Sequence, residues 1–409
     1  MKRRAAAAFC ALALSALPVP ALSAVITVPA AAAPSAPQPA LAQTGAAKLL
    51  EQVRQKYAPD PRTALFDVKL VTTPSGGLRL EGKTGVIGAA AELHAGIFTL
   101  GGNIAEAIKV LPSRDDLKDK IFAVVTVPEA RALNKPSGET TETLTLGTPM
   151  ALYEIEGDFL HVMLPDGTLA WVSKSQARQI SETEVLVWNR HDKLCAKKDG
   201  TAFKTADGKT MTLPALALLR RGADLENGRV EAWLPFGPKG TVNAADFVSQ
   251  EAFQKHEEMN RRERPERYLS FVAKTAGELV SGGAKFASGH ELVRRAFALH
   301  DLIVRRDADM MLEAFGKKNA VPLSEVRAGD VLFVKDKDGR LDTALAADRG
   351  KAFFGGQKAR PIKAAPGKII GAVRFNTGDL ADPCLVSTRS NGLYQTPAVM
   401  PRPCPAPKI

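Results

Sequence analysis

Apolar and polar positions alternate with two different periods in the first third of this chain. Apolar residues recur at helical spacing in 45–57 and in 89–100. Residues 65–73 and 77–85 alternate with the period of two that is typical of β-strands, and a Pro-Ser-Gly-Gly turn joins them. A third strand-like run follows the second helix. The order helix, strand, strand, helix, strand predicts a small α/β module over residues 44–118.

The middle of the chain contains an internal repeat. DFLHVMLPDGTLAWV occupies residues 158–172, and GRVEAWLPFGPKGTV occupies 228–242, so the offset between the copies is constant. In each copy an alternating strand stops at Leu-Pro-x-Gly and a second short strand follows. Short strands joined by tight turns predict one small β-barrel in residues 119–180 and another in 181–250.

The pattern changes again after the second copy. Residues 251–267 are strongly charged and predict a linker helix that leads into the last domain. Residues 268–376 read as several helices followed by several strands, which predicts an α+β domain. Residues 377–409 are rich in proline and show no periodic apolar pattern, so we expect a tail without regular structure.

The beginning of the chain has the pattern of an export signal. Three basic residues follow Met1, and an apolar run and small residues come next, which predicts a secretory signal peptide over residues 1–24. Cleavage after Ala42 is an alternative to cleavage after Ala24. Residues 25–43, rich in Ala and Pro, predict a flexible leader. The expected location is the periplasm or the cell envelope.

Composition limits the classes of partner. The 409 residues are 45% hydrophobic and 24% charged, which favours several folded domains over disorder. The formal net charge of +11 favours anionic surfaces such as wall polymers, and it leaves peripheral contact with membrane head groups open. Nucleic acid is not expected as a partner outside the cytoplasm. A solvated basic surface without any partner is equally consistent with this charge.

Cysteine placement suggests one disulfide and no metal site. Cys384 and Cys404 bracket the Pro-rich tail, and in an oxidising compartment we expect them to pair. In the chain-entropy picture such a loop stabilises the fold by roughly 3 kcal/mol. Cys195 enters a strand and predicts a buried thiol. We expect neither a cofactor nor a metal.

Two of the predicted modules resemble known kinds of domain. The element order of 44–118 is similar to that of BON-type domains, which associate with envelope surfaces. Residues 146–173, LGTPMALYEIEGDFLHVMLPDGTLAWVS, resemble bacterial SH3-like domains, although Ala170 stands where that family usually has Gly. The second copy lacks the closing Trp and is a looser match. Such domains bind cell-wall peptides or position a catalytic domain.

Residues 268–376 resemble the NlpC-type cell-wall endopeptidases, which are papain-like enzymes that cut peptidoglycan stem peptides. The matching pieces are Leu292-Val293, Arg306-Asp307 and the run from Ala328 to Phe333, AGDVLF, in the family's order. Two SH3-like modules before such a domain are also an arrangement of that family. The resemblance therefore implies a papain-like fold and a peptide ligand from the cell wall.

The catalytic residues of that family are missing here. With Leu292-Val293 on the family's Leu-Val pair, Gly289 stands where the cysteine belongs, and in the neighbouring register Ala287 does. Asp342 stands where a strand of the family begins with histidine. The reaction needs a thiolate that an imidazole activates, and neither group is present. The pattern therefore predicts a pseudoenzyme.

One alternative is an active cell-wall peptide hydrolase with non-standard catalytic residues. Ser288, His290 and Glu291 are chemically suitable for a serine-based triad. Adjacent helical residues point in different directions, however, so we favour Ser288 as a helix N-cap. A purely structural scaffold is a third interpretation.

Together these patterns predict an α+β multidomain chain with a small α/β module, two SH3-like β-barrels and a degenerate papain-like α+β domain. The predicted function is to bind peptidoglycan, muropeptides or a cell-wall partner protein, without catalysis. The candidate ligand-binding residues are Arg306, Asp307, Asp342 and Ser288.

Overall fold

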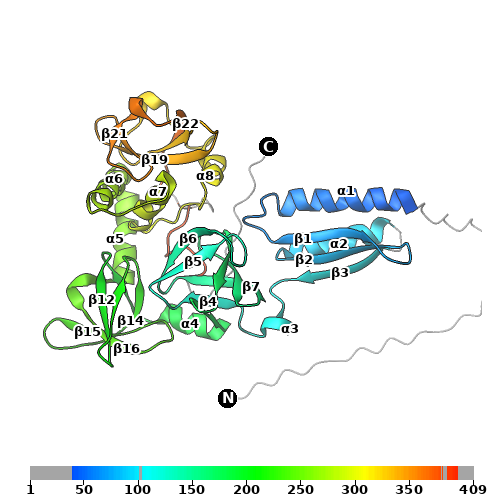
Figure 1. Cartoon of the computed structure of the whole chain (residues 1–409), viewed down its shortest axis with the longest axis horizontal. Coiled ribbons are helices and arrows are strands. Elements are labelled where there is room, and N and C mark those ends of the chain that lie inside the picture. The colour runs from blue at the N-terminus through cyan, green and yellow to red at the C-terminus, as the bar shows by residue number, and fades with distance from the viewer. Residues whose placement is uncertain (1–38, 101–103, 379, 381–384, 395–409) are drawn as a thin grey trace, which may run out of the picture.

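The computed structural model describes residues 39–100, 104–378, 380 and 385–394 (Figure 1). The chain is a mixed α/β protein with four separate sheets, which confirms the multidomain α and β architecture. The predicted signal peptide and both tail cysteines lie outside the described residues. Within the described residues, no helix is long and apolar enough to cross a bilayer.

The first module has two helices packed against a three-stranded sheet. Helices α1 (Pro39–Tyr57) and α2 (Ile87–Leu100) contact each other and the strands β1 (Phe66–Thr72), β2 (Leu78–Thr84) and β3 (Ile104–Val110). Strand β2 is central, antiparallel to β1 and parallel to β3. The apolar sides of helices and strands meet in one core, which includes Val53, Val68, Leu80 and Leu93.

Two seven-stranded antiparallel sheets follow. The first has the order β10-β4-β7-β8-β9-β5-β6, with β4 (Phe122–Val125), β5 (Glu129–Leu133), β6 (Thr140–Thr145), β7 (Pro149–Glu156), β8 (Phe159–Met163), β9 (Leu169–Ser173) and β10 (Ala177–Ile180). The second has the order β13-β12-β16-β15-β14-β11-β17, with β11 (Lys193–Ala196), β12 (Thr201–Thr205), β13 (Thr210–Leu213), β14 (Leu218–Asp224), β15 (Arg229–Trp233), β16 (Lys239–Asn243) and β17 (Phe247–Ser249). The short helices α3 (Arg114–Leu117) and α4 (Glu182–Arg190) precede the two sheets.

The two sheets have the same topology, because each strand of the first corresponds to the strand numbered seven higher in the second. The repeat in the sequence forms equivalent hairpins, β8–β9 and β15–β16. In both hairpins the turn glycine donates to the leucine before it, from Gly167 N to Leu164 O at 2.9 Å and from Gly237 N to Leu234 O at 3.1 Å.

Neither seven-stranded sheet is a closed barrel in the described part of the chain. In the first sheet β6 and β10 are the terminal strands and do not pair with each other, and in the second β13 and β17 are terminal. Each sheet surrounds its own apolar core. The sequence predicted the strands and their repetition, but the hydrogen-bond pattern leaves both sheets open.

The last domain packs helices against a five-stranded antiparallel sheet of order β21-β20-β19-β18-β22. Its elements are α5 (Gln250–Glu263), α6 (Pro265–Ser281), α7 (Gly289–Ala298), α8 (Ala308–Phe315), β18 (Val331–Lys335), β19 (Leu341–Ala347), β20 (Lys351–Phe354), β21 (Arg360–Pro361) and β22 (Lys368–Val373). Helices α6, α7 and α8 contact β19 and share one core with the sheet.

The AGDVLF run from Ala328 to Phe333 has a structural role in this domain. The side chain of Asp330 is fully buried and accepts two hydrogen bonds of 2.8 Å from Arg374. Gly329 before it has φ of 90° and lies against the backbone of Leu269, where no side chain would fit. These contacts hold the start of β18 against α6.

Part of the predicted tail is packed instead of free. In the segment 385–394, Val386 forms a β-bridge with Ile303, and Asn391 Nδ2 donates to Pro165 O at 2.5 Å. Leu393 is fully buried in a core with Trp188 of α4. Apart from this bridge these residues have no regular structure, yet the apolar side chain of Leu393 is covered by distant parts of the chain.

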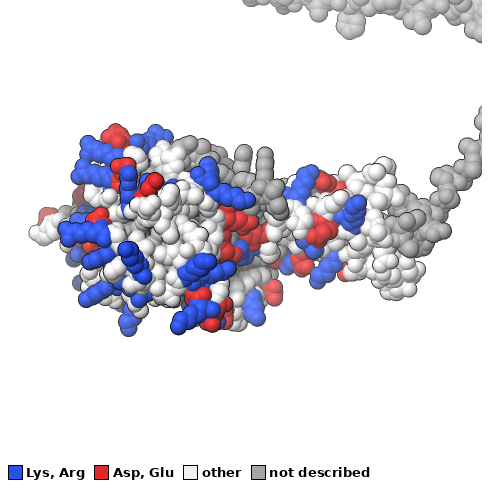
Figure 2. All heavy atoms as spheres, turned by 90° about the horizontal axis from the view of Figure 1, so that it is seen from above, with Lys and Arg blue, Asp and Glu red and all other residues white. Residues whose placement is uncertain are grey.

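The surface carries charges of both signs. Seen from the side of the last domain, Lys and Arg side chains are scattered with Asp and Glu between them (Figure 2). The positive net charge is therefore spread over this face instead of forming one continuous basic stripe.

Candidate functional site

Gly289 and Asp342, where the resemblance puts a cysteine and a histidine, lie next to each other. Asp342, on β19, accepts a hydrogen bond from Gly289 N to Oδ2 at 3.0 Å and one from His290 N to Oδ1 at 2.9 Å. Ser288 Oγ accepts from Glu291 N at 3.1 Å, so Ser288 is the N-cap of α7. A carboxylate at the positive end of a helix is favourable. Asp342 and Ser288 thus satisfy the first N–H groups of α7.

No space remains for a side chain at position 289. A Cβ on Gly289 would lie less than 3.0 Å from Thr343 O of β19 and 3.1 Å from Gly355 N. Backbone atoms cannot rotate away as a flexible side chain would. The backbone of the adjacent strand therefore fills the place that a nucleophilic side chain would need.

His290 is buried and engaged away from Ser288. Its ring nitrogens lie 3.2 Å from Thr343 Oγ1 and 3.0 Å from Arg305 O. Burial and the positive charge of Arg294 together lower the pKa of His290 to about 4, so the ring is neutral at pH 7. Since a carbonyl only accepts, Nε2 carries the proton and donates it to Arg305 O. Ser288, His290 and Glu291 form no hydrogen-bonded relay.

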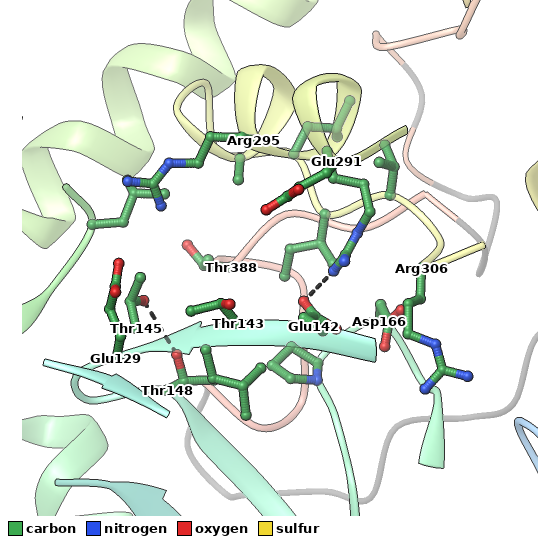
Figure 3. A pocket seen from close by; sticks show the side chains of 18 of the residues that line it. Glu129, Glu142, Thr143, Thr145, Thr148, Asp166, Glu291, Arg295, Arg306 and Thr388 are labelled. Carbon is green, nitrogen blue, oxygen red and sulfur yellow. Dashed lines mark hydrogen bonds and ion pairs between the residues drawn. The ribbon is translucent and has the colours of Figure 1, made fainter. Parts of the chain in front are cut away.

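A pocket of about 710 Å³ lies beside this site, between α7 and β6 (Figure 3). Its walls come from both seven-stranded sheets, from α5 to α7 and from the segment 385–394. Its ionisable lining residues are the acids Glu129, Glu142, Asp166, Asp199, Glu291 and Asp301, the bases Lys285, Arg294, Arg295 and Arg306, and His290 and Tyr394, with the thiol of Cys195. Acidic side chains therefore outnumber basic ones.

Two ion pairs cross the pocket from α7. Arg294 pairs with Glu142 of β6, and Arg295 Nη2 lies 2.7 Å from Asp199 Oδ1 in the turn between β11 and β12. Burial raises the pKa of Glu142, and the charge of Arg294 opposes this shift. The two ion pairs hold α7 against both seven-stranded sheets.

Five buried polar atoms on residues of the pocket lining have no hydrogen-bond partner within the described chain. They are Glu142 Oε2, Asp166 Oδ2, Arg294 Nε, Asp301 Oδ2 and Arg306 Nε. Buried polar atoms without partners are rare in folded proteins, because each costs about 1–3 kcal/mol. Residues that line a cavity and carry unpaired polar atoms are natural candidates for ligand contacts.

The structure brings two of the four predicted ligand residues to the pocket. Ser288 and Arg306 lie on its lining, whereas Asp307 and Asp342 do not. Arg306 is 7% exposed, and its Nη1 donates to Leu169 O at 3.0 Å. Asp307 instead forms an ion pair of 3.1 Å with Arg62, which ties the first module to the last domain.

The sequence interpretation missed most of the lining. Glu291, Arg294 and Arg295 have the spacing i, i+3, i+4 and lie on one polar side of α7, a signal that was available in the sequence. The segment 385–394 contributes Thr388 and Tyr394, for which no local pattern exists. Within the described residues, no cluster of His, Cys, Asp and Glu is able to hold a metal ion.

Comparisons with known proteins give only distant likenesses. No family profile and no curated protein matches the chain. An NlpC/P60 family protein from Bacillus cereus has a similar structure, with a TM-score of 0.47, 12% identity and coverage of 62% of this chain and 99% of that chain. An NlpC/P60 endopeptidase from Photobacterium damselae gives a TM-score of 0.37 and 14% identity over 59% of this chain and 60% of that chain. Likeness at this level assigns neither a family nor a function.

Proposed function

We propose that this protein is a non-catalytic binding protein of the cell envelope, whose pocket between α7 and β6 holds a peptide ligand. One observation carries the proposal. Gly289 stands where the resemblance puts the cysteine, and the backbone of Thr343 takes up the space of any side chain there.

Amide hydrolysis needs a nucleophile and a base in hydrogen-bond reach of each other. The carboxylate of Asp342 is bonded to two backbone N–H groups of α7 and has no nucleophile to activate. Ser288, the candidate of the hydrolase alternative, caps the helix, and His290 is bonded elsewhere. These contacts favour binding over turnover.

The pocket suits a ligand with charges of both signs. Guanidinium groups on α7 and carboxylates on both sheets line it, and several of their atoms have no partner. Peptides from the wall and segments of wall proteins carry both carboxylate and ammonium groups, so both remain candidates. The charged pattern and the lack of a nucleophile together support a sensor or tether.

The finer parts of the proposal rest on the sequence. The basic and apolar start of the chain supports export, and the resemblance of residues 146–173 supports SH3-like modules in the two repeated sheets. The last domain is proposed as a degenerate NlpC-like domain on its motif order. Its departures at Gly289 and Asp342 are the reason for assigning it a binding role.

The test combines turnover and binding on the chain without residues 1–24. Mass spectrometry should find soluble muropeptides uncut after long incubation, and calorimetry should find micromolar binding, about −8 kcal/mol, of muropeptides or of the peptides described below. Arg295→Ala should weaken binding about tenfold, because Arg295 lines the pocket. The matched control is Arg340→Ala, an exposed residue outside the lining.

Two results would overturn the proposal. Turnover that Ser288→Ala abolishes would establish a hydrolase. Binding that both arginine variants weaken equally, and that moderate salt removes, would show attraction to the basic surface alone.

A further inference from the structure

The floor of the pocket is the edge of a sheet. Strand β6 is terminal in the first seven-stranded sheet and pairs only with β5 in the described chain. All its residues, Thr140–Thr145, line the pocket. They include Leu144, which is 4% exposed and belongs to the sheet's core. Since the side chain of Leu144 points into that core, its main chain is what meets the pocket.

An edge strand has unpaired backbone groups. In an antiparallel pair, alternate residues direct N–H and C=O away from the partner strand. Proteins usually protect such edges with lysine, proline or a covering element. The sequence TTETLT of β6 has no lysine and no proline, and open pocket volume lies along it. At about 3.3 Å per residue, the strand offers roughly 20 Å of edge.

Acidic groups follow the same edge. Asp166 lies at one end of the pocket, Glu142 near its middle and Glu129 at the other end (Figure 3). Asp166 is 8% exposed, and its Oδ2 has no hydrogen-bond partner, as is true of Glu142 Oε2. Unpaired buried carboxylate oxygens favour a cationic side chain.

We propose that the pocket binds an extended L-peptide segment of a partner protein, which adds to the first seven-stranded sheet as a new strand beside β6 and places a basic side chain against Glu142 and Asp166. Strand addition of this kind takes its affinity from main-chain hydrogen bonds and its specificity from alternate side chains. The proposal rests on the proposed binding function and selects a protein segment over a wall stem peptide. The γ-linked and D-residues of a stem peptide would interrupt a regular ladder.

The probes are blocked hexapeptides in which lysine alternates with valine, threonine, tyrosine or leucine, titrated into the chain without residues 1–24. The chain keeps a positive formal net charge after the loss of Lys2, Arg3 and Arg4 with residues 1–24. It therefore repels these cations, and their binding reports the local site. At least one L-peptide should bind, and its D-form should bind at least tenfold more weakly. N-methylation of one alternate set of peptide residues should weaken binding tenfold or more. N-methylation of the other set should weaken binding less than threefold.

Two further measurements place the peptide on β6. Amide hydrogen exchange should slow at alternate residues of Thr140–Thr145 when the peptide is bound. Glu142→Gln should weaken binding about tenfold. The matched control is Glu139→Gln, because Glu139 is exposed, precedes the strand and lies outside the lining.

Several outcomes would overturn the proposal. Equal binding of L- and D-forms, equal effects of the two methylation sets, or unchanged exchange in β6 would show contacts through side chains alone. Binding of muropeptides but of no hexapeptide would refute strand addition and leave the proposed function standing. Binding of hexapeptides only after deletion of residues 395–409 would make the chain's own end the occupant.

Discussion

Replacing Gly289 by alanine tests the steric reason why position 289 carries no side chain. Gly289 is the first residue of α7, where helix propensity alone would favour alanine by up to about 1 kcal/mol. The added Cβ would instead collide with the backbone at Thr343 and Gly355. Overpacking against backbone typically costs 1–3 kcal/mol, and displacement of α7 would also strain the hydrogen bonds to Asp342. We expect the last domain to lose about 2–4 kcal/mol of stability.

The assay must report on the last domain by itself. All three tryptophans, Trp171, Trp188 and Trp233, lie outside this domain, so their fluorescence would follow the wrong transition. Amide hydrogen exchange of peptides from α7 and β19 measures the local opening free energy directly. The matched control is Gly371→Ala in β22, where a Cβ would have no neighbour within 4 Å. The opening free energy of the Gly371→Ala control should lie within about 1 kcal/mol of that of the natural chain.

A result in which both alanine variants behave alike would refute the reasoning. Position 289 would then have room for a side chain, and the fold would not be the reason that this position carries none. If the expected loss is found, Gly289→Cys combined with Asp342→His should also fail to cut muropeptides.

The remaining predictions concern the cap, the buried histidine and the buried thiol. Asp342→Ala should lower the opening free energy of α7, measured by amide hydrogen exchange, by about 2 kcal/mol, because two backbone N–H groups lose their carboxylate acceptor. An equal effect of Asp338→Ala, in the exposed hairpin, would contradict this. His290 has its pKa lowered to about 4, so its stabilising contribution is complete above about pH 6.5 and is lost as the pH falls to 4. The free-energy difference between the natural chain and His290→Asn, from denaturant unfolding, should therefore shrink by about 3 kcal/mol over that range, and a constant difference would refute it. Burial raises the pKa of Cys195 to about 12, so iodoacetamide should label it only after unfolding, as mass spectrometry can check; rapid labelling in the folded state would contradict this.

The sequence predicted those parts of the fold that local patterns encode. Strand alternation and the Leu-Pro-x-Gly turns of 158–172 and 228–242 are short-range signals, and both hairpins form where they indicate. The N-cap role of Ser288 also follows from its neighbours along the chain. In each case the deciding interaction joins residues only a few positions apart.

The rest depends on contacts between distant segments. The bond between Asp342 and the start of α7 joins residues more than 50 positions apart, and no local pattern announces it. Arg306 looked like a ligand contact, but its guanidinium also crosses to Leu169 of the first sheet. The place of β6 at the edge of a sheet follows from the pairing of all seven strands, which no local pattern encodes.

The packed segment 385–394 also sets the order in which the protein is completed. Leu393 fills a core that begins with Leu111 and includes Trp188, so this core lacks a piece until residue 393 has been synthesised. A ribosome releases the N-terminal modules first, and their apolar surface stays uncovered during that time. The hydrogen bond from Asn391 to Pro165 forms just as late. A chain that stops before residue 385 would therefore leave the first sheet permanently unfinished, although every strand of that sheet would be present.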